Sequence, residues 1–480
     1  MTILLFISAF LIRLINLNQS LWLDESIVAK VVKTIPFHLI PTQLSPGDVH
    51  PPFYYMAVSA WTSLFGYSEV VLRMPSILFS LIAGWFVYKI GRLLKNHTTG
   101  LWAAAFFLFN PLIIYYSQEA RMHMMAAMFL TIALYYFLSA IQPKPSKNDK
   151  TLFNVFAGFS MFTFYGSGFF IAAILIIYWF VIPMKIGIQK GNNKKSKLDW
   201  ISTFVEMTKM MFSMTWGLLF SLLILSPLLY SQMLNAKAGL ADLKNWSMAL
   251  GKAELKNVAM IFLKFATGRL SWYPKISYYL VSGIPTALIW LAALFGVRKN
   301  KLFGYLFILP LLFGLFVSFW APMMMYFRFL YLVPVMSILL AQSVIPMKIG
   351  IQKGLLNRFR IEYGMTALFL LFSLIYLLLP QFHREDWKEL GRHLNENIPV
   401  YMILPSSDPV GYYRSDVRVF ELRDIKKAVV PETIYVIPYT NEIYGLDHSQ
   451  LLKEKGCMKE SEQHFRGDLI LEKWICLRNA

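Results

Sequence analysis

The segment Met1–Glu25, MTILLFISAFLIRLINLNQSLWLDE, joins a long apolar run to two adjacent carboxylates. Met1–Leu17 has the length and composition of a membrane helix, and no small-residue cleavage site follows it. We therefore expect this helix to be retained, so that Asp24 and Glu25 stand where it meets water. Ionisable groups at such an edge are costly to hold unless they pair, hydrate or take part in chemistry. The two carboxylates are thus the first candidates for a functional site.

Apolar runs of similar length recur along the first 380 residues. The chain has 480 residues, of which 57% are hydrophobic and 15% charged, whereas soluble domains carry about 25% charged residues. Asn154–Ile182 is interpreted as two short helices that turn near Gly166 and Gly168. The runs predict an α-helical polytopic membrane protein with about 11 transmembrane helices. The remaining runs are Pro75–Leu94, Leu101–Tyr116, Met122–Ala140, Met211–Tyr230, Tyr278–Val297, Leu302–Trp320, Phe327–Ala341 and Tyr363–Pro380.

The formal net charge of +19 is concentrated in clusters between the apolar runs. If every cluster is cytoplasmic, the intervening loops fall on the opposite side of the membrane throughout, as the positive-inside rule predicts. The N-terminus is then cytoplasmic, and the loop 18–73 and the tail after Pro380 are extracytoplasmic. Orientation in a cell (inner) membrane therefore explains the charge, which gives no indication of nucleic-acid binding. The clusters are Lys89–Lys95, Lys144–Lys150, Lys185–Lys197, Arg298–Lys301 and Lys348–Arg360.

The last hundred residues have a different pattern. Residues 381–480 contain short apolar runs, such as Val400–Leu404 and Thr433–Pro438, separated by polar helical stretches. This pattern predicts a small extracytoplasmic α/β domain that follows a transmembrane catalytic domain of residues 1–380. Cys457 and Cys476 both lie in it, and they could form a disulfide outside the cytoplasm or remain two buried thiols.

One block of sequence occurs twice. Val181–Gly191 and Val344–Gly354 both read VIPMKIGIQKG. Structural repeats diverge while keeping their pattern, so an identical block between unrelated flanks indicates recent copying at the DNA level. Both copies fall in predicted cytoplasmic loops, where insertions are best tolerated. We interpret them as insertions without a catalytic role; the alternative is a paired docking motif.

The loop 18–73 carries most of the candidate chemistry, and a loop of this length in a membrane protein is usually functional. Asp24 and Glu25 could act in group transfer, since neighbouring carboxylates tune each other's pKa; the alternative is a solvated helix end. Asp48 and His50 could converge with either Asp24 or Glu25 on a divalent metal, although no ligand spacing is diagnostic. The sequence contains no Gly-rich phosphate loop, nucleophile motif or zinc pair on a helix.

Two further polar clusters fall on the same predicted side of the membrane. In Tyr115–His123, Arg121 could neutralise a phosphate bidentately or act as an interfacial arginine. Glu119 could bind substrate or pair with Arg121, and His123 is interpreted as a packed polar residue. The other cluster contains Arg328, which precedes an apolar run and could face a lipid phosphate or anchor its helix.

Together these motifs resemble the GT-C glycosyltransferases of the protein O-mannosyltransferase and aminoarabinose-transferase type. The resemblance covers most of the chain and is densest from Ser20 to Ala140. It implies a membrane enzyme that transfers a hexosyl or pentosyl group from a polyprenyl-phosphate carrier to a lipid, glycan or protein on the extracytoplasmic face. The motifs are SLWLDES (20–26), DVHPPFYY (48–55), SEVVLRMPS (68–76), YYSQEARMH (115–123), FRFLYLVP (327–334) and REDWKELGRHL (384–394).

The resemblance also implies a role for each cluster. Asp24 is the general base on the acceptor, Glu25 orients it or binds substrate, and direct displacement inverts the sugar carbon. The arginines hold the carrier phosphate, and the segment around the histidine shapes the cavity. No nucleotide is required. The residues implied to bind substrate are Asp48, His50, Tyr54, Tyr55, Arg73, Glu119, Arg121 and Arg328.

Other classes of protein stay open. A polytopic transporter or lipid flippase would place its charges near the bilayer midplane or at broken helices, whereas here they gather at one face. A non-catalytic assembly or sugar-binding subunit would tolerate the loss of Asp24. An O-antigen ligase or polymerase would use a diphosphate-linked carrier. The sequence also departs from many relatives at Phe164, which stands where they carry a histidine.

Overall fold

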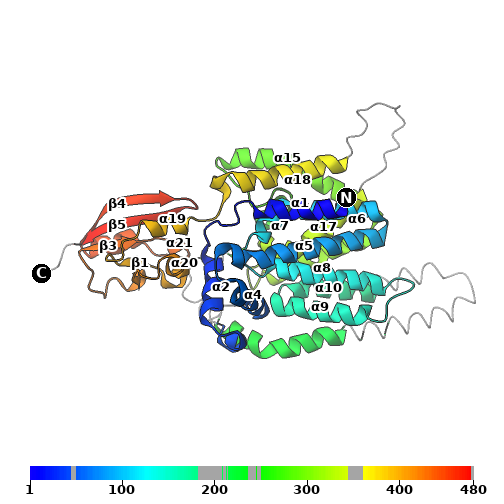
Figure 1. Ribbon diagram of the computed structural model, residues 1–480, viewed down its shortest axis with the longest axis horizontal. Helices are drawn as coiled ribbons and strands as arrows, with labels where there is room; N and C mark the ends of the chain where they lie inside the picture. The colour runs from blue at the N-terminus through cyan, green and yellow to red at the C-terminus, as the bar shows by residue number, and fades with distance from the viewer. Residues whose placement is uncertain are drawn as a thin grey trace, which may run out of the picture.

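The computed structural model describes residues 1–44, 50–181, 215–235, 250–343 and 361–476, together with residues 208, 212 and 245. Figure 1 shows a bundle of helices with a small sheet at one end of it. Helix α1 (Thr2–Leu14) begins at the end of the bundle opposite to the sheet. The chain after α1 therefore enters the junction between bundle and sheet.

Apolar sequence accounts for the helices of the bundle. Among the described residues, five helices are long and apolar enough to cross a membrane, or six if a bent pair counts as one span. Four shorter apolar helices accompany them, so the total of about 11 spans stays a prediction. After α1 the bundle contains α5 (Glu69–Leu94), α6 (His97–Leu108), α7 (Pro111–Ser117), α8 (His123–Ala140), α9 (Asp149–Thr163), α10 (Ser167–Ile176), Thr215–Asn235, α14 (Leu255–Thr267), α15 (Lys275–Lys299), α16 (Lys301–Val317), η3 (Tyr326–Leu332), α17 (Val333–Ser343) and α18 (Ile361–Leu378).

Two breaks interrupt these helices, and local sequence explains the first. The Asn110 side chain accepts the amides of Leu112 and Ile113, and Pro111 follows it, so α7 starts anew at an angle of 61° to α6. Helices α9 and α10 are separated by residues 164–166, which confirms the predicted pair of short helices in this segment.

Glycines allow α5 and α6 to approach closely. A Cβ atom added at Gly91 would lie 2.8 Å from the Cα atom of Gly100. One added at Gly100 would lie 2.6 Å from the carbonyl oxygen of Tyr88. The two backbones are therefore in direct contact, as is common where small residues meet between membrane helices.

The loop predicted at residues 18–73 is largely helical. It contains α2 (Leu23–Thr34), η1 (Phe37–Leu39), α3 (Ile40–Gln43) and α4 (Phe53–Phe65) before α5 begins at Glu69, earlier than the predicted apolar run. Helix α2 lies across the end of the bundle, next to the sheet (Figure 1). Asp24 and Glu25 occupy its first turn, where the helix dipole favours negative charge. Asp48 and the two copies of VIPMKIGIQKG, apart from Val181, lie outside the described residues.

The C-terminal part forms a five-stranded mixed sheet in the order β2-β1-β3-β5-β4, which confirms the predicted α/β pattern. The strand β1 (Val400–Met402) runs parallel to β2 (Val419–Glu421) and β3 (Thr433–Val436), and β5 (Leu469–Cys476) runs antiparallel to β3 and β4 (Cys457–Phe465). The division into domains at residue 380 stays a prediction. The helices of this part are α19 (Trp387–Arg392), α20 (Asp408–Tyr413), α21 (Asn441–Tyr444) and α22 (His448–Glu454).

A disulfide joins the ends of the last hairpin. Cys457 and Cys476 are directly opposite each other in β4 and β5, and their sulfur atoms are bonded. Of the two alternatives left open by the sequence, the bridge is therefore the one found. One apolar cluster around Trp387 and another around Trp474 stabilise the sheet.

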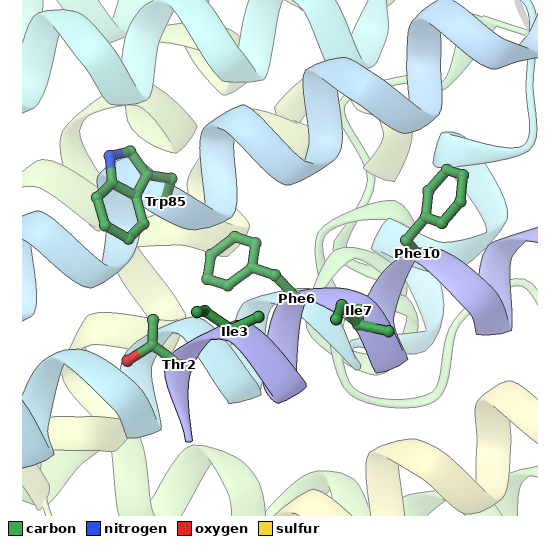
Figure 2. Close-up of a pocket in the computed structure, with 6 residues that line it drawn as sticks. All are labelled: Thr2, Ile3, Phe6, Ile7, Phe10 and Trp85. Carbon is green, nitrogen blue, oxygen red and sulfur yellow. The ribbon is translucent and has the colours of Figure 1, made fainter.

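An apolar groove runs along the outer surface of the bundle between α1 and α5. Figure 2 shows Phe6 turned toward Trp85, and the two rings meet edge to face at 6.0 Å. Ile3 and Ile7 beside them are exposed. Side chains of this kind suit contact with lipid acyl chains, and the groove contains none of the polar residues discussed below.

Candidate active site

Glu25 and Arg73 form the buried centre of a site at the junction. Arg73, in α5, donates through Nε and Nη2 to the two Glu25 oxygens at 2.8 and 2.6 Å. Its remaining N–H groups bind the carbonyl oxygens of Leu17, Gln19 and Ser20 at 2.6 to 2.9 Å. Both charged side chains are 0% exposed. This bidentate pair fixes the chain that leads into α2.

Glu25 has two further partners. The amide of Ala120 donates to Oε1 at 2.8 Å, and Nε of Arg384 lies 3.7 Å from Oε2. Burial alone would raise the pKa of Glu25, but the guanidiniums of Arg73 and Arg384 hold it below its usual value. Glu25 is therefore an ionised carboxylate enclosed by protein donors.

Asp24 differs from its neighbour in its access to solvent. Its side chain is 33% exposed, and Oδ2 lies 3.3 Å from Nη2 of Arg121. The guanidinium of Arg121 is itself nearly buried. Of the two adjacent carboxylates, Asp24 is the one that a substrate could reach.

Glu119 lies in the turn between α7 and α8. Its carbonyl oxygen accepts from Oγ of Ser76 at 2.6 Å and from the amide of Arg121 at 2.9 Å. Its carboxylate lies 3.8 Å from Nη2 of Arg384. Burial raises the pKa of Glu119 to about 7, although Arg384 acts in the opposite direction. This carboxyl group therefore titrates near neutral pH.

Two arginines of the site were not among the predicted residues. Arg384, which follows α18, is buried with its guanidinium 4.4 Å from the ring centre of Tyr115. Arg269, which follows α14, is exposed, lies 5.6 Å from the ring centre of Trp22 and donates to the hydroxyl of Tyr115. Arg384 is the first residue of the motif REDWKELGRHL, so this motif could have identified it from the sequence. Arg269 follows Gly268 at a helix end, and nothing in its spacing distinguishes it.

The turn that carries Arg269 is held from two sides. Nζ of Lys264 donates to the carbonyl oxygen of Leu270 at 2.6 Å and to the hydroxyl of Tyr278 at 2.9 Å. Gly268 has a φ of +71°, and a Cβ atom there would lie 2.8 Å from Cβ of Pro111. Arg269 is therefore positioned against α7, the helix that also carries Tyr115.

The other predicted residues lie on neighbouring elements. The half-buried His50 accepts from Nε2 of Gln232 through its carbonyl oxygen at 3.0 Å, whereas Tyr54 and Tyr55 of α4 are buried. Arg328 is half-buried in η3, and its Nη1 lies 3.3 Å from the carbonyl oxygen of Pro322.

His123 connects two of these regions, because its ring packs against Tyr116 and Phe327 at 5.5 and 5.2 Å. Phe164, at the position of the departure noted in the sequence, lies 5.8 Å from the same ring. Within the described ranges, no group of three or more His, Cys, Asp or Glu side chains is arranged to hold a metal ion.

Comparison with known proteins agrees with the resemblance inferred from the sequence. Residues 49–196 match the model of the family described as dolichyl-phosphate-mannose-protein mannosyltransferase. No curated protein matches the sequence.

The solved structures show the fold. ArnT from Cupriavidus metallidurans in the apo state is 12% identical, with 98% of this chain and 97% of that chain covered and a TM-score of 0.58. The same protein bound to undecaprenyl phosphate is 11% identical, with the same coverage and a TM-score of 0.56. The archaeal oligosaccharyltransferase AglB from Archaeoglobus fulgidus is 12% identical over 95% of this chain and 72% of its own, with a TM-score of 0.47. The chain thus has the fold of ArnT over 98% of its length.

Proposed function

We propose that this chain is an integral-membrane glycosyltransferase that moves a sugar from a polyprenyl-phosphate carrier to an acceptor on the extracytoplasmic face. The observation that carries the proposal is the contrast between the two adjacent carboxylates. Glu25 is enclosed by Arg73, Arg384 and the Ala120 amide, whereas Asp24 is accessible and lies beside Arg121. The match to a mannosyltransferase family and the fold of a protein solved with undecaprenyl phosphate support the choice of donor.

In the proposed reaction, Asp24 accepts the proton of the acceptor hydroxyl or amine as that atom attacks the anomeric carbon. The bond from this carbon to the phosphate oxygen breaks, and the polyprenyl phosphate leaves with its negative charge. One displacement of this kind inverts the sugar carbon. The chain contributes alignment, a base and cationic groups near the departing phosphate.

The contacts of the arginines favour a different role for each of them. The N–H groups of Arg73 are bound within the protein, so we assign it to holding Glu25 rather than the carrier. Arg121 lies beside Asp24 and is assigned to orienting this base. Arg269 is exposed and Arg328 is half-buried, and we assign the carrier phosphate to these two.

We place this site on the extracytoplasmic side of a cell membrane, with the N-terminus in the cytoplasm. The disulfide between Cys457 and Cys476 supports this placement, because such bonds persist mainly in oxidising compartments. The C-terminal sheet would then lie outside the cytoplasm, above the donor's phosphate. We assign no metal ion to the reaction, and addition of a chelator to the assay below tests that assignment.

The proposal is tested by transfer of radiolabelled sugar from polyprenyl-phosphate donors in membranes that contain the wild type or a variant. Asp24→Asn should reduce turnover by about 100-fold or more, since a positioned general base typically contributes that much. Glu389→Gln, which alters an exposed carboxylate on α19, is the matched control and should leave turnover unchanged.

The two variants separate the outcomes. Transfer by the wild type and by Glu389→Gln, with loss in Asp24→Asn, supports the enzyme and its base. Equal transfer by all three proteins contradicts the role of Asp24. If well-expressed wild type transfers sugar only from diphosphate-linked donors, the proposed donor class is wrong.

A further inference from the structure

Four charged side chains are removed from water at the junction of bundle and sheet. Glu25 and Arg73 form the bidentate pair described above, and Glu119 lies beside them. Arg384 completes the group, with Nε 3.7 Å from Glu25 and Nη2 3.8 Å from Glu119. Each of the four side chains is at most 2% exposed. Arg384 is the member that comes from the segment after the last bundle helix.

When Glu119 is ionised, the charges of this group balance only if Arg384 is present. Two carboxylates face two guanidiniums, and the N–H groups of Arg73 are bound to Glu25 and to three carbonyl oxygens. The other cations that act on Glu119 are Arg121 and Arg269, which already contact Asp24 and Tyr115. Removal of one partner from a buried group of this kind leaves an uncompensated charge.

The sheet fixes the backbone that carries Arg384. Nε of Arg466, in the turn between β4 and β5, donates to the carbonyl oxygen of Arg384 at 2.9 Å. The Arg466 side chain also pairs with Asp386 at 3.1 Å, and the amide of Asp386 donates to the carbonyl oxygen of Arg466 at 3.0 Å. A Cβ atom at Gly467 would lie 2.6 Å from Cα of Glu385. The hairpin therefore holds residues 384–386 by hydrogen bonds, an ion pair and close packing.

We infer that Arg384 is a positioning residue for the transfer reaction, an inference that rests on the function proposed above. By neutralising Glu25 and Glu119, it keeps the first turn of α2 against the Ala120 amide, so that Asp24 faces Arg121. The C-terminal sheet, through Arg466, sets the place of Arg384. The sheet is thus part of the apparatus that orients the base.

The test compares transfer kinetics of four full-length proteins with the wild type. Arg384→Gln should lower kcat by about tenfold or more, since small displacements of a catalytic group can cost up to about 100-fold, while KM for the carrier changes little. Arg384→Lys should retain more of the rate. Arg384→Gln combined with Glu119→Gln should recover part of the loss, because the uncompensated carboxylate is removed. Arg392→Gln, at an exposed arginine on α19, should match the wild type.

Hydrogen exchange of the same proteins gives a readout that does not depend on transfer. In Arg384→Gln, the amide of Ala120 and those of the first turns of α2 should exchange faster, while those of β5 remain protected. If Arg384→Gln fails to fold, Arg466→Gln replaces it, because this change releases the Arg384 carbonyl and keeps its guanidinium.

The inference is overturned if wild type transfers sugar and Arg384→Gln behaves as Arg392→Gln does. It is also overturned if adding Glu119→Gln restores nothing and exchange in α2 is unchanged. If the wild type itself transfers no sugar, the proposed function fails, and the exchange experiment alone decides whether Arg384 positions α2.

Discussion

At the scale of single residues, the chain places two neighbouring carboxylates in opposite environments. Glu25 is directed into the protein, where Arg73 and a backbone amide enclose it. Asp24, one position earlier on the same helix turn, remains partly exposed beside Arg121. Adjacent positions on a helix point about 100° apart, so one side chain can anchor the turn while the other faces the site. The pair therefore divides into a buried anchor and a partly exposed carboxylate.

The raised pKa of Glu119 predicts that the stability of the folded protein depends on pH. Its folded pKa of about 7 exceeds the usual value of 4.5, so the folded state binds more protons between these values. The free energy that protonation of Glu119 contributes to folding is fully present below about pH 4.5, and it is lost as the pH rises through about 7. Above pH 7, Glu119→Gln should unfold at a higher temperature than the wild type, by the equivalent of about 3 kcal/mol at most. Thermal unfolding in detergent between pH 5 and 8 measures this, and a difference that does not depend on pH contradicts it.

The assignment of Arg269 to the carrier phosphate predicts an effect on carrier binding. Arg269→Ala should raise KM for the polyprenyl-phosphate carrier about tenfold, because a hydrogen bond to a charged group contributes about 1.5–3 kcal/mol. Arg298→Ala, at the last turn of α15, is the control and should leave KM unchanged. Steady-state transfer at varied carrier concentration distinguishes the two variants, and equal KM values for both would remove Arg269 from the phosphate site.

At the scale of elements, close backbone contact sets the arrangement of the helices around the site. Helices α5 and α6 meet at Gly91 and Gly100, and α5 carries Arg73 at its other end. The short α7 follows at an angle of 61° and brings Tyr115 toward Arg269 and Arg384. The positions of Arg73 and Tyr115 thus depend on a helix contact and on a bend, both distant from Asp24 in sequence.

The helix contact can be tested with two glycine variants. Gly100→Ala places a methyl group against the carbonyl oxygen of Tyr88 and should destabilise the protein by about 1–3 kcal/mol. Gly283→Ala, inside α15 with nothing within 4 Å of the added carbon, should be neutral or slightly stabilising. Thermal unfolding in detergent compares them, and equal midpoints would mean that the α5–α6 contact relaxes without cost.

Hydropathy and local sequence composition predicted where the helices and strands lie. They did not predict which of these elements contact one another. Apolar runs located most bundle helices, and the break near Gly166 followed from local composition. The pairing of Glu25 with Arg73 and Arg384 could not be predicted, because it depends on tertiary packing between segments far apart in the chain. The acidic pair was found from its setting at a membrane edge, but the separate environments of its two members required the fold.

At the scale of the whole molecule, helices α19 and α20 of the C-terminal part are docked on the first loop by specific polar contacts. The hydroxyl of Tyr413 accepts the amide of Leu21 at 2.8 Å and lies 3.2 Å from the carboxylate of Glu69. Lys388 reaches the same carboxylate at 3.2 Å, and Lys30 pairs with Asp408 at 2.7 Å. Exposed ion pairs contribute little, so the buried end of this interface at Leu21 is expected to dominate the docking.

Tyr413→Phe tests the docking. Loss of the hydroxyl leaves the Leu21 amide without this partner, which should weaken docking by about 1–2 kcal/mol. Backbone amides of residues 20–26 should then exchange faster with solvent. Tyr363→Phe, at an exposed tyrosine on α18, is the matched control. If residues 20–26 exchange equally in both variants, the C-terminal part is docked by other contacts.

The place of Arg384 in the chain has a consequence for how the protein is made. The ribosome delivers Glu25, Arg73 and Glu119 long before the residue that balances them, because Arg384 follows every helix of the bundle. Until that residue emerges and the last hairpin packs against it, Glu25 and Glu119 lack the guanidinium that lies beside both of them in the folded protein. Completion of this buried charged group is therefore one of the final events of biosynthesis, and a chain terminated before Arg384 would lack one of its two guanidiniums.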